Sequence, residues 1–516
     1  MPSLPNKIMN EAPKDQGDQL PQRKGFWRRQ FSWHGLRRAL IGLVVLITLI
    51  ALAVTEENWR GKRDWENYRR ILEANGEHLD WQAFVPPAVP DDQNFFMAPV
   101  FRKILSEKIQ LDPWPKNEKG YAYEYGDFRK SMVTDLKPWQ RAYRALGENQ
   151  NGDKFPISPQ PQTPGADVLL ALSIYDPVVE ELREASRRPY ANVPLHYENG
   201  ISVATTDLLP NLAALKRCAQ ILMIRSLAEL ADGQNQKALD DIKLLLYLNE
   251  SLHSQPLLIS QLVRIAIVNI ALQPIWEGLA GHKWSEEQLV DLETELAKID
   301  YLDDYELSIR CERALAIQSL ENQRLTHEIK LPIKDGDTMS VKVILMPSAY
   351  FYQNELSFAQ VSEQWTLRLV DTNSRVISPT HYRAIDAAMH AQQRHLSLYT
   401  IQARMIASAL ASIVKKIAVS QSDVDMARVV CALERYRLAH GAYPESLDAL
   451  EPQFIAQVPH DIINGEPLHY RINPDGQFTL YSVGWNEKDD GGQVVLLKSG
   501  MANRDQGDWV WQYPAN

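Results

Sequence analysis

The sequence has few cysteines. Its 516 residues include only Cys218, Cys311 and Cys431, and none of the three belongs to a CxxC pair, a zinc-ligand spacing or a disulfide framework. Each lies in an apolar helical pattern, so we expect three small, buried hydrophobic side chains. The fold therefore does not rely on disulfide bonds, even if the chain faces an oxidising compartment.

The sequence also lacks the usual catalytic motifs. GxSxG, GxxxxGK[ST], GxGxxG and HExxH do not occur in it. His390 and His395 are five residues apart, which separates them by about 140° around a helix instead of placing them on one face. We therefore name no catalytic residue, and the sequence favours a protein that is not an enzyme.

Paired acidic and aromatic residues have simpler explanations than catalysis. Adjacent carboxylates, as in Asp91-Asp92 and Asp240-Asp241, do not face one another on a helix. At Asp303-Asp304 we expect helix N-capping. The aromatic groups at 121–125 and 350–352 could stack on sugars, but we interpret them as core or interface residues.

A strongly basic body is missing too. The chain carries a net charge of −10, and residues 1–38 alone carry +5, which leaves −15 for the remainder. So acidic a body is poorly suited to bind a phosphate backbone. We therefore expect no nucleic-acid partner.

What the sequence does contain is one long apolar run. Residues 39–54 read ALIGLVVLITLIALAV, without a charge. Extended to 36–55, the segment has the roughly twenty residues that a helix needs to cross a ~30 Å hydrocarbon core. It has no polar face, unlike a helix of a soluble core. We predict a single transmembrane anchor at 36–55, through which the protein contacts the membrane.

Charged flanks indicate the orientation of this anchor. Six Lys or Arg residues lie between positions 23 and 38, and Glu56 and Glu57 follow the run. The positive-inside rule places residues 1–35, a basic tail, in the cytoplasm and residues from 56 onward outside it. Ala51-Leu52-Ala53 matches a signal-peptidase site, so cleavage after Ala53 stays open. The long leader and the charged helix that follows without a break favour a retained anchor.

The exported region begins with a connection and continues as a mostly helical domain. Residues 56–93 comprise a charged juxtamembrane helix that ends at Gly76 and a proline-rich linker, FVPPAVP. Residues 94–422 form the large domain, in which apolar residues recur every three or four positions. The 256–280 segment is interrupted by polar residues, so we interpret it as a buried bundle helix, not a second span. We expect helices at 166–187, 208–231, 235–254, 256–280, 285–298, 303–324 and 381–440.

Period-two patterns predict strands in two places. A β-hairpin is expected at 327–345, where apolar residues alternate on both sides of Asp335-Gly336, a strong tight-turn signal. At the C-terminus, an amphipathic helix at 423–440, with Met426, Val430 and Leu433 on its apolar face, precedes three short strands. These are expected at 468–472, 478–483 and 494–497. Residues 423–516 therefore form a small α+β module, with one helix against an antiparallel sheet.

The C-terminal segment resembles a known family. The strings ALERYRLAHGAYPESLDAL, VPHD, GEPLHY and FTLYSVG, followed by an acidic loop with glycines, occur in this order. Residues 423–492 thus resemble the soluble domain of the major pseudopilin of type II secretion. The chain as a whole is not a pseudopilin, because its apolar run contains no glutamate and lies some 370 residues before the module.

This resemblance implies a calcium site. Pseudopilins of this kind bind calcium in the loop after the YS-x-G strand, and the matching residues are Asn486, Asp489 and Asp490. Apart from the resemblance, Asp505 or Asp508 could add further oxygen ligands of the kind that calcium takes. Asn486 stands where the family tends to have an aspartate, which weakens the implication. The alternative is a solvated loop whose Asp and Gly residues make turns. We expect no other cofactor.

More loosely, the layout resembles membrane-anchored bacterial envelope proteins with a KRDWENY-like juxtamembrane helix and a PPAVPDDQNF-like segment. We therefore predict a mainly α, single-pass protein of the bacterial inner membrane with its bulk in the periplasm. Its expected role is structural or in assembly, through contacts with other envelope proteins. The alternatives are a ligand-binding or sensing module, which needs a pocket between the helices, and an exported hydrolase.

Overall fold

The computed structural model describes residues 33–514, with gaps at 107–108, 110, 115–125, 149–154, 197–200, 333–337, 345 and 394–400. The described chain is mostly helical and carries small antiparallel sheets. Its helices are α2 (Trp33–Ala74), α3 (Pro99–Leu105), α4 (Lys137–Glu148), α5 (Pro164–Leu172), α6 (Asp176–Ala185), α7 (Ile201–Ala231), α8 (Asn235–Glu250), α9 (Leu258–Ala280), α10 (Glu286–Leu296), α11 (Tyr301–Thr326), α12 (Ser348–Val361), α13 (Pro379–Gln393) and α14 (Ile401–His440). Its strands are β1 (Glu328–Pro332), β2 (Thr338–Lys342), β3 (His469–Ile472), β4 (Phe478–Ser482), β5 (Val494–Leu496), β6 (Ala502–Gly507) and β7 (Trp509–Gln512).

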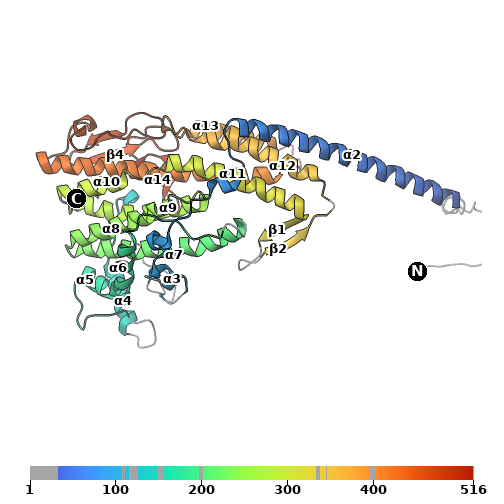
Figure 1. Ribbon diagram of the computed structural model, residues 1–516. Helices are drawn as coiled ribbons and strands as arrows, with labels where there is room; N and C mark the ends of the chain where they lie inside the picture. Colours follow the sequence, from blue (N-terminus) through green and yellow to red (C-terminus); the bar gives the residue numbers. More distant parts are fainter. Residues whose placement is uncertain are drawn as a thin grey trace, which may run out of the picture.

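Helix α2 is one uninterrupted helix of 42 residues. Its N-terminal part extends away from the body, whereas its C-terminal part lies along α12 (Figure 1). The apolar part is long and hydrophobic enough to cross a membrane, and its most apolar window is entirely unburied. The helix ends just before Gly76, whose φ of +84° suits glycine. The predicted juxtamembrane helix and its end are confirmed.

Helix α9 occupies the centre of a helical bundle. It packs against α7, α8, α11 and α14, and 67% of its most apolar window is buried. The polar residues that interrupt its sequence are buried as well, among them Gln261, Arg264 and Gln273. The length and composition of α9 alone would also permit a membrane span, but its packing confirms the predicted bundle helix.

From residue 417 to residue 434, helix α14 is buried on both faces, so the prediction of an amphipathic helix at 423–440 is wrong for this part. Met426, Val430 and Leu433 are buried as expected, but Val424 and Cys431 on the opposite side are equally buried. The reason is that α10, α9 and α12 cover one part of the helix and β4 and β7 cover another. The helix also begins at Ile401, far before position 423.

The C-terminal sheet has the strand order β3-β4-β7, and all its pairs are antiparallel. Leu480 of β4 lies opposite Trp511 of β7, and both side chains are fully buried. Strands β3, β4 and β5 confirm the predicted ones to within a residue or two. Strands β6 and β7 were not predicted. The predicted helix against an antiparallel sheet is therefore present.

A separate hairpin, β1 with β2, places Glu328 opposite Lys342 and Pro332 opposite Thr338. This confirms the predicted hairpin, although its turn lies outside the described residues. One hydrophobic cluster includes side chains from α7, α9, α14 and the C-terminal sheet. A smaller cluster joins Trp65 and Leu72 of α2 to α11 and α12. The core of the helical domain thus continues into residues 423–516, and whether that segment forms a module of its own stays a prediction.

Candidate functional site

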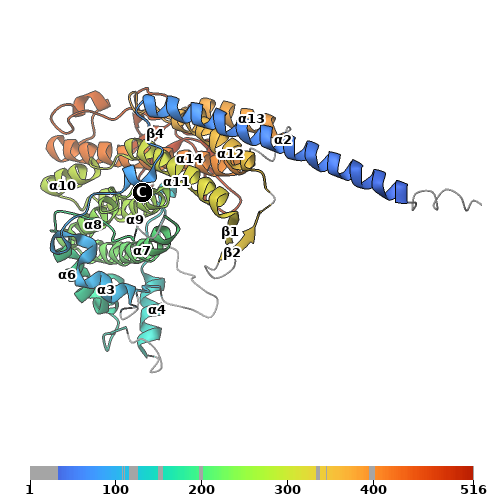
Figure 2. The same ribbon diagram turned by 45° about the vertical axis from the view of Figure 1, so that its right-hand side comes forward.

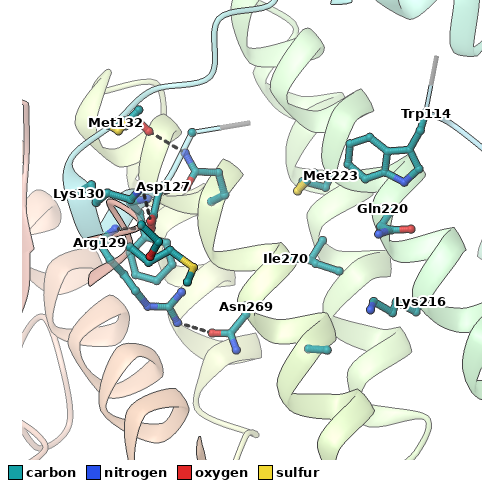
Figure 3. A pocket seen from close by; sticks show the side chains of 16 residues that line it. Trp114, Asp127, Arg129, Lys130, Met132, Lys216, Gln220, Met223, Asn269 and Ile270 are labelled. Atoms are coloured by element: carbon teal, nitrogen blue, oxygen red, sulfur yellow. Dashed lines mark hydrogen bonds and ion pairs between the residues drawn. The ribbon is translucent and has the colours of Figure 1, made fainter. Parts of the chain in front are cut away.

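A cavity of about 670 Å³ lies between α7 and α9. Lys216, Gln220 and Met223 of α7 face Asn269 and Ile270 of α9 across it (Figure 3). The segment 126–132 closes one side, and Trp114, Ser499 and Met501 complete the described wall. Its size falls within the roughly 300–1,000 Å³ typical of small-molecule sites.

Two polar side chains of α9 hold residues 126–134 in place. The Gln273 side chain accepts a hydrogen bond from the Phe128 backbone N–H at 2.7 Å and donates one to the Met132 carbonyl at 3.1 Å. Glu277 accepts hydrogen bonds from the backbone N–H and the hydroxyl of Thr134 at 2.9 and 2.7 Å. A Cβ at Gly126 would lie 2.2 Å from the Met132 carbonyl oxygen, so this close approach requires glycine.

Arg129 links this segment to two helices. Its Nε donates a hydrogen bond to Asp423 Oδ2 of α14 at 3.0 Å, and its Nη2 donates one to Asn269 Oδ1 of α9. The Asp423 side chain is only 3% exposed. A buried carboxylate with a charged guanidinium partner is held firmly, because breaking the pair would leave one charge uncompensated. The pair thus fixes Arg129 at the cavity wall.

Positive charge predominates around the cavity. Lys130 lies 3.5 Å from Asp127, and Lys216 is exposed at the rim. Burial, together with the charge of nearby Arg129, lowers the pKa of Arg504 to about 10. Arg504 therefore still carries its charge near neutral pH. Three cationic side chains, those of Arg129, Lys130 and Lys216, and one carboxylate, that of Asp127, line the cavity, whereas Asp423 holds Arg129 without lining it. Sequence alone offers no signal for this cluster, because its members are distant in the chain; Arg129 and Asp423, for example, are 294 residues apart.

The predicted calcium loop lies elsewhere, between β4 and β5, and it is held by its own hydrogen bonds. The Asp508 carboxylate accepts hydrogen bonds from the backbone N–H groups of Asp490 and Gly492 at 3.2 and 2.6 Å. The Asp489 carboxylate accepts one from the Tyr481 hydroxyl at 3.0 Å, and Asn486 Nδ2 donates one to Asp490 at 2.7 Å.

These contacts place Asp508, between β6 and β7, against the loop that contains Asn486, Asp489 and Asp490. Asp505 instead forms an ion pair with Lys415 of α14. Among the described residues, no group of three or more His, Cys, Asp or Glu side chains is placed to hold a metal ion. Backbone donors already bind both oxygens of Asp508, and the Tyr481 hydroxyl and the Gly491 N–H bind Oδ1 of Asp489. Calcium binding in this loop stays a prediction.

The acidic pair Asp303-Asp304, singled out in the sequence, lies at the start of α11. Asp300, and not Asp303, caps α11, because its carboxylate accepts hydrogen bonds from the backbone N–H groups of Leu302 and Asp303 at 3.0 and 3.3 Å. Asp304 is instead buried beside Arg264 of α9. The expected capping by the pair Asp303-Asp304 is therefore wrong by one helical turn.

Buried positions also account for the remaining candidates that the structure describes. Asp241 is buried and binds Arg183 and Arg225. Tyr350 and Phe351 belong to the buried core, as predicted. Cys218, Cys311 and Cys431 are free and buried, which confirms their interpretation. The tyrosines at 121–125 and His395 lie outside the described residues.

The cavity is therefore the strongest candidate site in the described part of the chain. It offers cationic and amide groups, with Arg129 and Asn269 fixed by their hydrogen bonds, and three methionines, whose flexible side chains adapt to different ligands. Its chemistry suits an anionic or polar small molecule. Comparisons of the chain with protein-family models, with curated proteins and with solved structures found no match.

Proposed function

We propose that the protein is a membrane-anchored component of the bacterial envelope, whose exported body is held at the membrane surface and acts there through contacts with other envelope proteins. The observation that carries this proposal is the continuity of α2. A single helix contains the apolar segment and also packs into the body. An anchor joined in this way fixes the position of the body relative to the bilayer.

The flanks of the apolar segment support a retained anchor. Trp33 and Trp59 are 79% and 61% exposed, one before and one after the segment. They are 26 positions apart, which at 1.5 Å per residue corresponds to about 39 Å. This is close to the ~40–45 Å between the two interfacial regions of a bilayer, where tryptophan is enriched.

The junction between α2 and the body supports a rigid connection. The Asn58 side chain accepts a hydrogen bond from the Ala349 backbone N–H at 2.7 Å. Just beyond the end of α2, Glu77 forms ion pairs with Arg310 and with the fully buried Arg313. Contacts at both ends of 58–77 leave this part of the helix little freedom to swing away from α11 and α12.

Reporter fusions test the orientation. A reporter that is active only in the periplasm should be active after Asn516 and inactive after Arg38, because the arginine-rich flank stays in the cytoplasm. The matched control moves positive charge across the segment, with Arg37 and Arg38 replaced by Glu and Glu56 and Glu57 replaced by Arg, and should weaken the asymmetry. The reverse pattern in the unchanged chain would overturn the proposal.

Contacts with envelope proteins require a separate test. Photo-crosslinkers placed on exposed body positions in living cells should give discrete adducts with defined envelope proteins, dependent on the anchor. Absence of specific adducts from every exposed face would contradict the structural or assembly role while leaving the anchor intact.

A second candidate function is binding of an anionic small molecule, which the cationic cavity favours. Inorganic phosphate and pyrophosphate serve as probes, since their oxygens match the lysine and arginine donors. Binding to the folded state should raise the melting temperature of the full chain in detergent. Lys216→Glu should abolish the rise, whereas Lys237→Glu, the same charge change at an exposed position of α8 outside the cavity lining, should keep it. No rise with either anion would dismiss these ligands.

A further inference from the structure

The β1–β2 hairpin and the ends that flank it expose apolar side chains. Leu325, Met339, Val341 and Ile344 are 64%, 49%, 36% and 68% exposed. Isolated exposed hydrophobic residues are common on protein surfaces, but a contiguous group indicates an interaction site. Met339 and Val341 lie on β2, Ile344 lies just after it, and Leu325 lies at the end of α11, just before β1. The exposed apolar side chains are thus concentrated at the hairpin and its two ends.

The two faces of the hairpin differ in polarity. Met339 and Val341 alternate with Ser340 and Lys342 on β2, so they point to the opposite face. On the polar face, the Ser340 hydroxyl donates a hydrogen bond to Glu328 at 2.9 Å, and Lys342 lies 3.6 Å from the same carboxylate. A two-stranded hairpin has little stability in water by itself. Covering its apolar face would stabilise it.

The position of the hairpin relative to α2 indicates what covers it. Helix α12 follows the hairpin directly, and the backbone of Ala349 near its start binds Asn58. Asn58 lies three residues after the predicted end of the span, or about 4.5 Å along the helix axis. Ile344 is only five residues before Ala349. The connection from β2 to α12 is therefore held close to the level at which α2 leaves the bilayer.

The views agree with this placement. In both Figure 1 and Figure 2 the hairpin lies on the side of the body toward the apolar part of α2, whereas α4 and β4 lie farther away. Trp59 on α2, at the same level as the start of α12, is also exposed.

We propose that the apolar face of the β1–β2 hairpin inserts into the interfacial region of the membrane that α2 spans. This inference rests on the proposed anchoring of α2. The bilayer that surrounds the apolar segment of α2 is the surface nearest to the hairpin, and we therefore take lipid as the occupant of its apolar face. The hairpin is then a second, shallow contact beside the transmembrane helix. Two contacts at separate points restrict the tilt of the body, which one helix alone does not.

Depth-dependent fluorescence quenching tests the proposal. The variants Met339→Cys, on the apolar face, and Ile344→Cys, in the connection after β2, are each labelled with an environment-sensitive fluorophore in the full chain, reconstituted in phosphatidylethanolamine–phosphatidylglycerol vesicles. The three native cysteines are buried and remain largely unlabelled under native conditions. Leu46, in the apolar part of α2, serves as the anchor control, and Leu496 on β5, 54% exposed, serves as the exposed control.

A quencher attached near the lipid headgroup should reduce the emission of labels at 344 and 339 at least twofold, and leave the label at 496 unchanged. A deep quencher should act on the label at 46. If the headgroup quencher reduced the emission of the labels at 344, 339 and 496 equally, while the deep quencher still acted on the label at 46, hairpin insertion would be overturned and the anchor would remain supported. The labels at 344 and 339 could also be shielded from aqueous iodide and yet be insensitive to lipid quenchers. That result would assign the apolar face to a protein partner or a second copy of the chain, and would also overturn the proposal. No quenching at 46 would refute the proposed anchoring itself.

Discussion

Arg264 and Asp304 show how individual charges join the helices of the bundle. Their side chains are 0% and 4% exposed and form an ion pair between α9 and α11. Arg264 also donates hydrogen bonds to Gln261 Oε1 at 2.9 Å and to the Asn249 carbonyl at 3.1 Å. The sequence marks Arg264 only as a polar interruption, because its partner lies 40 residues away.

We expect Asp304→Asn to destabilise the protein strongly. The change leaves the buried guanidinium with only the longer, partly exposed pair to Glu250 at 3.6 Å, and loss of a buried ion-pair partner costs up to about 3–5 kcal/mol. Glu184→Gln is the matched control, since its pair with Arg187 is 73% exposed on both sides and should cost less than about 1 kcal/mol. Urea denaturation of the full chain in detergent measures both. Equal stabilities of the two variants would contradict the assigned burial.

Glu355 gives a prediction about pH. The residue is 1% exposed on α12, and burial raises its pKa to about 7, with Arg324 nearby opposing the rise. Between pH 4.5 and 7 the unfolded chain therefore loses a proton that the folded chain keeps, so stability falls as pH rises through this window. Above pH 7 the cost reaches on the order of 3 kcal/mol.

Replacing the titrating group should remove this dependence. The free energy of unfolding of Glu355→Gln should therefore rise relative to that of the unchanged chain as the pH increases from 4.5 to 8, by up to about 3 kcal/mol. Denaturation curves of both proteins at the two pH values give the difference. A constant difference across the range would show that Glu355 is already charged in the folded state.

At the scale of elements, the sequence predicts what local patterns determine. The β1–β2 hairpin follows from alternation around Asp335-Gly336, and the end of α2 follows from Gly76. Strand β6, with the sequence ANRDQG, has no alternation that could reveal it. The burial of both faces of α14 also escapes prediction, because the helices and strands that cover it come from distant parts of the chain.

The continuity of α14 leads to an expectation for the C-terminal segment. A fragment of residues 423–516 would expose Val424 and Cys431, which are fully buried in the whole chain. It would also lose the contact between His282 and Glu434, 3.0 Å long, which joins the α9–α10 connection to α14. We expect the fragment to show no cooperative melting by circular dichroism, whereas the full chain melts cooperatively. A sharp transition of the fragment would establish an autonomous pseudopilin-like module.

At the scale of the molecule, the sequence predicts the mainly helical fold and the apolar segment, because composition and periodicity carry this information. The cavity between α7 and α9 could not be predicted in the same way. Its wall includes Arg129 and Asn269, and Asp423 of α14 holds Arg129 in place; only the tertiary fold brings these three residues together. The candidate calcium residues Asn486, Asp489 and Asp490 do share one loop, but that proximity follows from their spacing in sequence.

The central claim is that α2 is retained as an anchor and carries the body at the membrane. The intact mass of the protein, isolated from the membrane fraction of cells after an alkaline wash, tests this claim most directly. We predict a detergent-requiring chain that keeps residues 1–53. A water-soluble chain whose mass corresponds to a start at Val54 would contradict it, because α2 would then be cut within its apolar segment and the body released.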